Sequence, residues 1–245
     1  MSREISDNKE ERNKDSNRAH STYPELLFGI SWLATHQGKA SVQDLKKLKR
    51  IMGYVKAHPD HCMTLKPKSL KIICAADASY GDHHDGKSHS GGVVGFEGDN
   101  KCISPVMFIC GKQPVVAKSS FEAEIIAAST VGDSFVWFSD FMGEIDLVVA
   151  GSIMYQDNKS AIISMEKGGG SFKRTKHIKI RYFWLKALVD EGVLKFEYVQ
   201  TAEMVADILT KPLVGPVFQF LAEKITGWFG VKKLGAGVPK AGVEI

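Results

Sequence analysis

The spacing of apolar residues along the 245-residue chain changes once, near Ser69. Between residues 21 and 57 they recur at helical intervals, in two stretches separated by Gly38-Lys39-Ala40, and Ser41 is placed to cap the second helix. His58-Pro59-Asp60 ends this pattern. The sequence therefore predicts a small two-helix segment ahead of a main domain with a different periodicity.

After residue 69, short apolar runs bounded by turn residues indicate strands, and longer amphipathic stretches indicate helices. In chain order the expected elements are strands at 70–79, 90–98 and 104–112, a helix at 120–142, a strand at 147–156, helices at 159–167 and 175–192, a strand at 193–200 and a helix at 202–211. Three strands with short links favour an antiparallel meander, and the later alternation demands a mixed sheet. The expected fold class is α/β, with a five-stranded mixed sheet flanked by helices.

The same pattern divides the chain into four parts. We expect a disordered charged tail at residues 1–20, a helical segment at 21–66, the main domain at 67–213, and a C-terminal helix followed by a flexible tail at 214–245. The division rests on the charge of the first twenty residues, the change of periodicity, Pro212 and the glycine-rich end.

Composition narrows the class of protein. The chain is 44% hydrophobic and 24% charged, which is typical of a globular domain. It has no apolar run that could span a bilayer and no apolar secretory signal, and its four cysteines form no C-x-x-C pair. We expect an intracellular protein, cytoplasmic or nuclear and not secreted, with no membrane partner. The oligomeric state stays open.

Four acids have the sequence context of a shared site. Asp77 and Asp157 each follow an apolar strand-like run, so their carboxylates converge if those two strands are neighbours. Glu124 shares its stripe of the long helix with apolar residues, whereas Glu122 does not. Asp207 is surrounded by apolar residues in "MVADILTK", and a carboxylate buried alone is costly.

Carboxylates brought together repel each other unless cations neutralise them. Such oxygen ligands suit magnesium or manganese, and two ions about 3.5 to 4 Å apart can perform in-line phosphoryl chemistry. Each acid taken alone could instead cap a helix or form its own ion pair. The order and context of the four acids favour the shared site.

The segments "KSHSGGVVGF", "KQPVVAKSSFEAEIIAAS", "QDNKSAI", "RTKHIKIRYFWLK" and "EYVQTAEMVADILTKPL" resemble the ribonuclease H domain of copia-type retrotransposon polyproteins, from about Ser69 to Leu213. "LKKLKRIMGYVKAHPD" resembles the connection segment of those elements. The resemblance implies a ribonuclease H-like fold and cleavage of the RNA strand of RNA–DNA hybrids. It also implies two Mg²⁺ ions, for which Mn²⁺ can substitute, held by a metal-binding and catalytic quartet of Asp77, Glu124, Asp157 and Asp207.

The chain departs from the broader ribonuclease H pattern in two ways. Many of these enzymes carry a histidine shortly before the last aspartate, but no histidine lies between Tyr198 and Asp207. His177 matches the "TKHI" motif, and its role, structural or substrate-binding, stays open. No Tyr-x-Asp-Asp polymerase signature is present, so we expect a fragment or derivative of such an element, with the polymerase part of a reverse transcriptase as a partner.

Basic and hydroxyl residues near the acids are candidates for binding the hybrid, whose backbone and shape are what proteins recognise. They are Ser79, Lys112, Lys118, Ser120, Lys173, Arg174, Lys176 and His177. Ser120 could instead cap the long helix. His83, His84 and His89 could bind zinc, but their spacing favours a solvated turn.

Two other functions compete with a ribonuclease H. A strand-transferring integrase uses three acids with the glutamate last, whereas here the glutamate comes second and a fourth acid follows. A catalytically silent nucleic-acid-binding or scaffold remnant of the element would need no acids, and all four are present. The sequence therefore favours the hydrolase.

Overall fold

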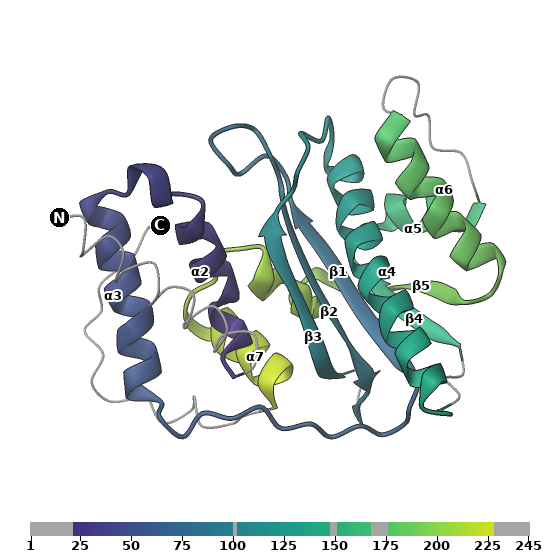
Figure 1. Cartoon of the computed structure of the whole chain (residues 1–245), viewed down its shortest axis with the longest axis horizontal. Helices are drawn as coiled ribbons and strands as arrows, with labels where there is room; N and C mark the ends of the chain where they lie inside the picture. Colours follow the sequence, from purple (N-terminus) through teal and green to yellow (C-terminus); the bar gives the residue numbers. More distant parts are fainter. Residues whose placement is uncertain (1–21, 100–101, 148–150, 168–175, 228–245) are drawn as a thin grey trace.

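A five-stranded mixed sheet forms the centre of the computed structural model, which describes residues 22–99, 102–147, 151–167 and 176–227 (Figure 1). The strand order is β3-β2-β1-β4-β5. Neighbours pair antiparallel from β3 to β1 and parallel from β1 to β5. The strands are β1 at Ile72–Ser79, β2 at His89–Glu97, β3 at Ile103–Lys112, β4 at Ser152–Gln156 and β5 at Leu194–Tyr198. The predicted α/β fold class is confirmed.

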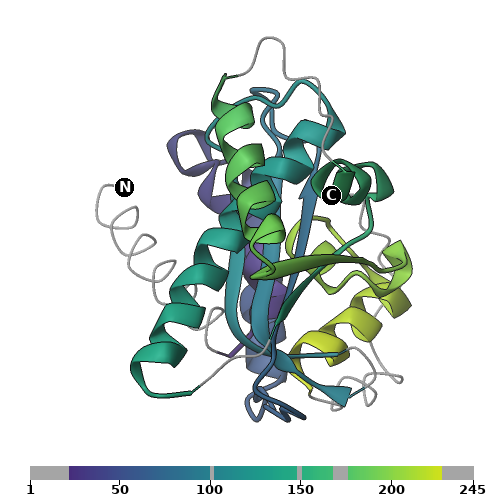
Figure 2. The same ribbon diagram turned by 90° about the vertical axis from the view of Figure 1, so that its right-hand side faces the viewer.

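Helices cover both faces of this sheet. One face carries α4 at Ser120–Glu144, α5 at Lys159–Lys167 and α6 at Lys176–Asp190; the other carries α2 at Leu27–Ala34 and α7 at Gly215–Thr226. In Figure 2 the teal helix α4 and the yellow-green helix α7 lie on opposite sides of the blue strands. Successive side chains of a strand point to opposite faces, so β1 supplies both cores. Ile72 and Cys74 join the α4 side, and Ile73 and Ala75 join the α7 side.

The N-terminal helical segment packs against this second face. It contains the short 3-10 helices η1 (Pro24–Leu26) and η2 (Gln37–Lys39) and the helix α3 (Val42–Ala57). The predicted cap is confirmed, because the Ser41 hydroxyl accepts a hydrogen bond from the Asp44 N–H at 3.2 Å and the Asp44 carboxylate accepts one from the Ser41 N–H at 2.8 Å. Leu27 of α2 belongs to the same buried cluster as Ile73, so the predicted boundary at residue 66 does not separate two cores.

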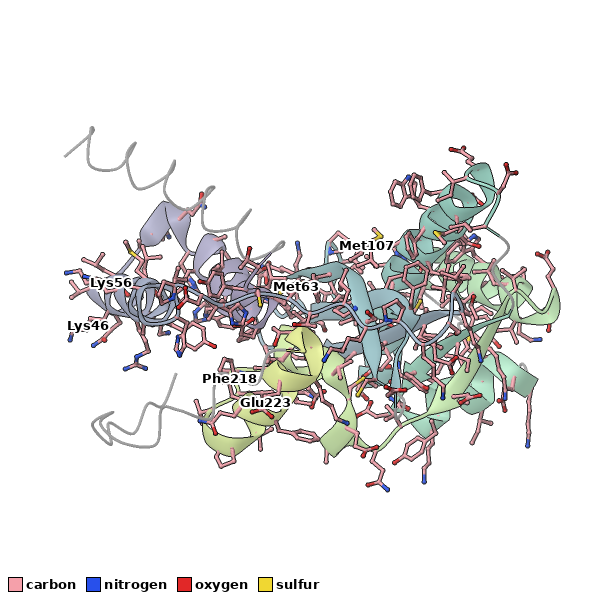
Figure 3. All side chains as sticks on the ribbon, turned by 90° about the horizontal axis from the view of Figure 1, so that it is seen from below. Lys46, Lys56, Met63, Met107, Phe218 and Glu223 are labelled. Carbon is pink, nitrogen blue, oxygen red and sulfur yellow. The ribbon has the colours of Figure 1, made fainter. Side chains whose placement is uncertain are left out.

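Helix α3 lies at the edge of the molecule. Its lysines Lys46 and Lys56 are exposed, and in Figure 3 they project from the side of the molecule farthest from α4, whereas Met107 of β3 marks the sheet.

Most predicted element bounds agree with the structure, and α5 agrees at both ends. The predicted helix at 202–211 is wrong, because this segment forms two 3-10 helices, η4 at Thr201–Glu203 and η5 at Val205–Leu209. Met204 between them has an extended backbone, with ψ near 100°. All residues from 204 to 210 are buried, so the segment is enclosed on every side instead of presenting one apolar stripe.

Adjacent glycines of β2 let elements approach the sheet from opposite sides. A Cβ on Gly92 would lie 2.1 Å from Cγ2 of Val131 in α4, and a Cβ on Gly91 would lie 2.5 Å from Cγ2 of Thr210, directly after η5. Gly91 also pairs with Asp77 of β1. The close approach of η5 to the sheet beside Asp77 therefore requires glycine at position 91.

We predict that Gly91→Ala lowers the free energy of unfolding by about 1–3 kcal/mol, because the added methyl group overlaps Thr210 and Leu209. Urea unfolding followed by circular dichroism measures the change. Gly111→Ala in β3 is the control, since a Cβ there meets no atom within 4 Å. Equal stability of the two variants would contradict the predicted close packing.

Candidate metal centre

Asp77 and Asp157 lie where two parallel strands diverge. The pairing of β1 with β4 covers only Ile73–Ala75 of β1, so this side of the strand is open at Asp77. Asp157 directly follows the last residue of β4. Asp77 does not end β1, which continues to Ser79 through its antiparallel pairing with β2, as the predicted strand at 70–79 does. The two carboxylates were predicted to converge if β1 and β4 are neighbours. The two strands do pair, and the carboxylates of Asp77 and Asp157 lie close together.

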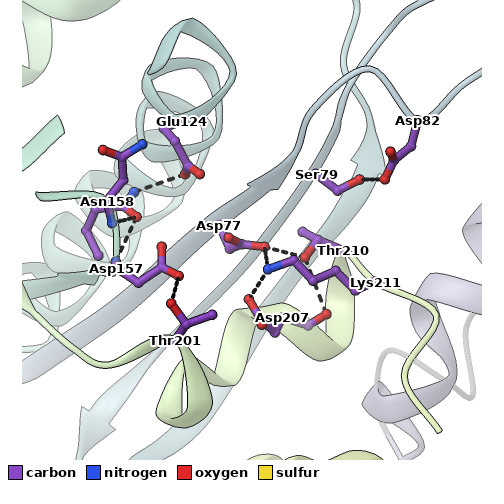
Figure 4. A network of polar contacts seen from close by, with 11 residues as sticks. Asp77, Ser79, Asp82, Glu124, Asp157, Asn158, Thr201, Asp207, Thr210 and Lys211 are labelled. Atoms are coloured by element: carbon purple, nitrogen blue, oxygen red, sulfur yellow. Dashed lines mark hydrogen bonds and ion pairs between the residues drawn. The ribbon is translucent and has the colours of Figure 1, made fainter. Parts of the chain in front are cut away.

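Asp207 completes a group of three aspartates (Figure 4). The 3-10 helix η5 carries Asp207 over the α7 side of the sheet, the side to which Asp77 points. One carboxylate oxygen from each of Asp77, Asp157 and Asp207 lies within 4.8 Å of the others. Oxygen ligands of this kind fit magnesium or manganese, which prefer carboxylates. Within the described ranges, no other trio of histidine, cysteine or acidic side chains has ligand atoms grouped in this way.

Glu124 lies beside this group but outside it. Its carboxylate accepts a hydrogen bond from Nε2 of the buried Gln156 at 3.2 Å. Burial, with Asp77 and Asp157 nearby, raises the pKa of Glu124 to about 9. As predicted, Glu124 is the buried acid of the pair on α4, whereas Glu122 sits at the helix start and accepts a hydrogen bond from the Lys118 N–H at 2.9 Å.

A single ammonium group contacts two of the three aspartates. Lys211 Nζ lies 2.7 Å from Asp207 Oδ1 and 3.5 Å from Asp77 Oδ2. Burial and the nearby Asp77 charge raise the pKa of Asp207 to about 7, and Lys211 opposes this rise. Burial, with the Asp77 charge nearby, therefore favours a proton on Asp207 near neutral pH.

Neutral side chains fix the orientation of the acids. Thr210 donates a hydrogen bond to Asp77, and Thr201 donates one to Asp157 at 2.8 Å. Gln156 Oε1 accepts from the N–H groups of Asp157 and Asn158 at 2.9 and 3.1 Å. Neither these three residues nor Lys211 are among the site residues predicted from the sequence. The i, i+4 spacing of Asp207 and Lys211 was a usable signal for their ion pair.

The predicted nucleic-acid contacts are only partly placed at the surface. Lys118, Ser120 and Lys176 are exposed, and Lys112 is partly exposed and forms an ion pair with Asp85 at 2.9 Å. Ser79 is buried and donates a hydrogen bond to Asp82. Lys173, Arg174 and the His177 side chain lie outside the described residues.

The alternative capping role of Ser120 is wrong. Ser119 is the cap residue of α4, and its hydroxyl accepts a hydrogen bond from the Glu122 N–H at 3.2 Å.

The histidine-rich turn holds buried rather than solvated rings. His83 Nε2 lies 3.1 Å from His89 Nδ1, and His89 Nε2 lies 3.3 Å from Cys110 Sγ. Trp32 of α2 stacks on His83, with ring centroids 4.7 Å apart. Burial lowers the pKa of His89 to about 4, so its ring is neutral at pH 7. These contacts join α2 to the sheet, which corrects the expectation of a solvated turn for His83 and His89.

Comparison with curated proteins identifies relatives of the chain. The retrovirus-related Pol polyprotein from transposon RE1 of Arabidopsis thaliana is 28% identical over 206 residues, and that from transposon TNT 1-94 of Nicotiana tabacum is 29% identical over 206 residues. The chain is therefore similar in sequence to retrovirus-related Pol polyproteins from transposons. The aligned region is 83% of this chain but only 14 to 15% of those Pol polyproteins. No protein-family model matches the chain.

Solved ribonuclease H structures are also similar. LC11-RNase H1, isolated from compost by a metagenomic approach, shares 18% identity over 58% of this chain and 94% of its own, with a TM-score of 0.44. The N-terminal RNase H domain of rv2228c from Mycobacterium tuberculosis shares 20% identity over 58% of this chain and 91% of its own, with a TM-score of 0.40.

Among the residues that the structure describes, no helix combines the length and the apolar character needed to cross a bilayer.

We predict that, in EDTA, the free energy of unfolding falls as the pH rises from about 7 to about 9. The folded chain keeps protons on Glu124 and Asp207 that the unfolded chain releases, since both pKa values are raised on folding, so higher pH favours unfolding. Glu124→Gln should flatten this slope and stabilise the chain at pH 8 by about 1 kcal/mol or more. Urea titrations at each pH measure both effects.

Glu144→Gln, at the exposed end of the same helix, is the control and should leave the slope unchanged. If the wild-type chain has the same stability at pH 7 and pH 9, Glu124 does not carry the raised pKa value.

Proposed function

We propose that this chain is a metal-dependent endonuclease that cleaves the RNA strand of RNA–DNA hybrids. The observation that carries the proposal is the approach of one oxygen each from Asp77, Asp157 and Asp207 to within 4.8 Å, with the buried Glu124 beside them. These acids come from β1, the end of β4, η5 and α4. The sequence similarity to Pol polyproteins and the ribonuclease H-like arrangement of the sheet support the same activity.

The acids fit a site for two Mg²⁺ ions, with Mn²⁺ as a substitute. Ions bound there would polarise the attacking water and neutralise charge on the leaving 3′ oxygen. The chain itself holds the carboxylates in place: Thr210 fixes Asp77, Thr201 fixes Asp157, and Gln156 fixes Glu124. These donors orient Asp77, Asp157 and Glu124, and a carboxylate oxygen that accepts one hydrogen bond keeps a second lone pair that can bind an ion.

The hybrid would be held by its phosphates rather than by its bases. Lys118 and Ser120 lie at the start of α4, the helix that carries Glu124, and Lys176 lies at the start of α6. All three are exposed, and we propose them, with Lys112, Lys173, Arg174 and His177, as the backbone contacts. A polymerase part, as in a reverse transcriptase, would extend this surface.

We predict that the purified chain cuts the RNA strand of a labelled RNA–DNA hybrid in Mg²⁺ or Mn²⁺, and that Asp157→Asn lowers the rate at least about 100-fold. The size follows because even groups that only support a metal ligand are worth about 10 to 100-fold. Gel analysis of labelled RNA measures cleavage. Asp140→Asn, an exposed acid of α4, is the control and should cut at the wild-type rate.

Absence of cleavage at every Mg²⁺ and Mn²⁺ concentration would contradict the nuclease proposal. Tight binding of the hybrid without cleavage would instead favour the catalytically silent scaffold.

We predict that the affinity of the chain for the hybrid in EDTA falls at least about tenfold between 50 and 200 mM salt, as expected for two or more phosphate contacts. Lys176→Met should reduce the slope by about one contact, as measured by fluorescence anisotropy. Lys68→Met is the control, because Lys68 is exposed and precedes β1, at the end of the strand away from Asp77. A slope unaffected by Lys176→Met would remove Lys176 from the proposed contacts.

A further inference from the structure

Lys211 occupies the position of a cation in the aspartate group. Its Nζ lies 2.7 Å from Asp207 Oδ1 and 3.5 Å from Asp77 Oδ2, so one ammonium bridges two of the three converging acids (Figure 4). Among the ion pairs of the described residues, those of Lys211 are the ones that involve these aspartates. The sequence motif that contains Lys211 contributes Asp207 to the proposed function, but the lysine has no role there.

The backbone around Lys211 is fixed, whereas its side chain can move. The Lys211 N–H donates a hydrogen bond to the Asp207 carbonyl oxygen at 2.9 Å, and the Thr210 N–H donates one to the same oxygen at 3.1 Å. Thr210 also donates to Asp77, and Pro212 follows directly. The unbranched lysine side chain is 34% exposed, so its end can leave the acids for solvent without disturbing this turn.

A divalent cation and this ammonium cannot share the same oxygens. Mg²⁺ binds carboxylate oxygens at about 2.0–2.1 Å. An ion bridging Asp77 and Asp207 would take the space between their oxygens that Nζ now occupies, and two positive charges in contact repel strongly in a buried site. A divalent ion and the Lys211 ammonium therefore cannot occupy the position between Asp77 and Asp207 at the same time.

We propose that Lys211 is the internal counter-ion of the metal-free site, and that binding of a divalent cation displaces its ammonium from Asp207 and Asp77. In this arrangement the lysine limits repulsion among the acids before ions bind, and it competes with them for the same oxygens. The inference rests on the metal site of the proposed function, but it does not require that the chain cleave RNA.

The first test compares cation binding by the full chain and by Lys211→Met, using isothermal titration calorimetry with Mn²⁺. Removal of the competing ammonium should tighten Mn²⁺ binding about three- to tenfold and lower the melting temperature in EDTA. Lys87→Met is the matched control, because Lys87 is 31% exposed and faces a single carboxylate, that of Asp85, at 3.8 Å. It should leave the Mn²⁺ affinity unchanged.

The second test needs no variant and so does not depend on folding of Lys211→Met. A brief pulse of acetic anhydride acetylates free lysine amines, and peptide mass spectrometry gives the rate at each position. Mn²⁺ should raise the rate at Lys211 several-fold relative to Lys87 in the wild-type chain, because the released ammonium loses its carboxylate partners.

Mn²⁺ affinity that is unchanged or weaker in Lys211→Met, or an acetylation rate at Lys211 that Mn²⁺ does not raise, would overturn the inference while leaving the proposed nuclease intact. Release of Lys211 by Mn²⁺ in a chain that fails to cut the hybrid would support the inference and contradict the nuclease.

Discussion

Repulsion between neighbouring carboxylates is the constraint on which this structure depends. Three aspartates place oxygens within 4.8 Å of one another, and a buried glutamate adds a fourth negative charge when ionised. In a medium of low polarity such a group would push its elements apart. The folded chain offsets the repulsion with the raised proton affinity of Glu124 and Asp207 and with the ammonium of Lys211.

The scaffold holds these acids together by covering both faces of one strand. Strand β1 is buried along its whole length, between α4 on one side and η5 with α7 on the other. Because Gly91 and Gly92 of β2 have no side chains, η5 and α4 pack directly against the two faces of the sheet. Thr210, directly after η5, is then close enough to donate a hydrogen bond to Asp77. The stability of the core and the geometry of the site therefore depend on the same contacts.

The sequence predicts most of this fold because apolar periodicity directly reflects which face of an element is buried. It also predicts that Asp77, Glu124, Asp157 and Asp207 share one site. That prediction rests on where each acid lies relative to the apolar residues of its own strand or helix. The predicted α-helix at residues 202–211 is wrong, because residues 204–210 are all buried and the segment has no single apolar stripe to indicate its periodicity.

Gln156, Thr201, Thr210 and Lys211 were missed for a related reason. Each acts through a partner distant in sequence or through a turn, and only the assembled sheet brings the hydroxyls of Thr201 and Thr210 to the aspartates. Such polar residues have many surface roles, so their type alone predicts nothing specific. For the same reason, the sequence names exposed lysines as candidates for substrate binding, but residue type alone does not show which of them contact the hybrid.

The side chain of Gln156 gives the site a fixed direction of hydrogen bonding. Its Oε1 accepts from two backbone N–H groups, which can only donate, so its orientation is not ambiguous. Its NH₂ group must then face Glu124, and Glu124 Oε2 must accept whether or not the carboxyl carries a proton. A proton on Glu124 is therefore favoured on Oε1, because the unprotonated oxygen of a carboxyl group is the better acceptor for the Gln156 NH₂ group.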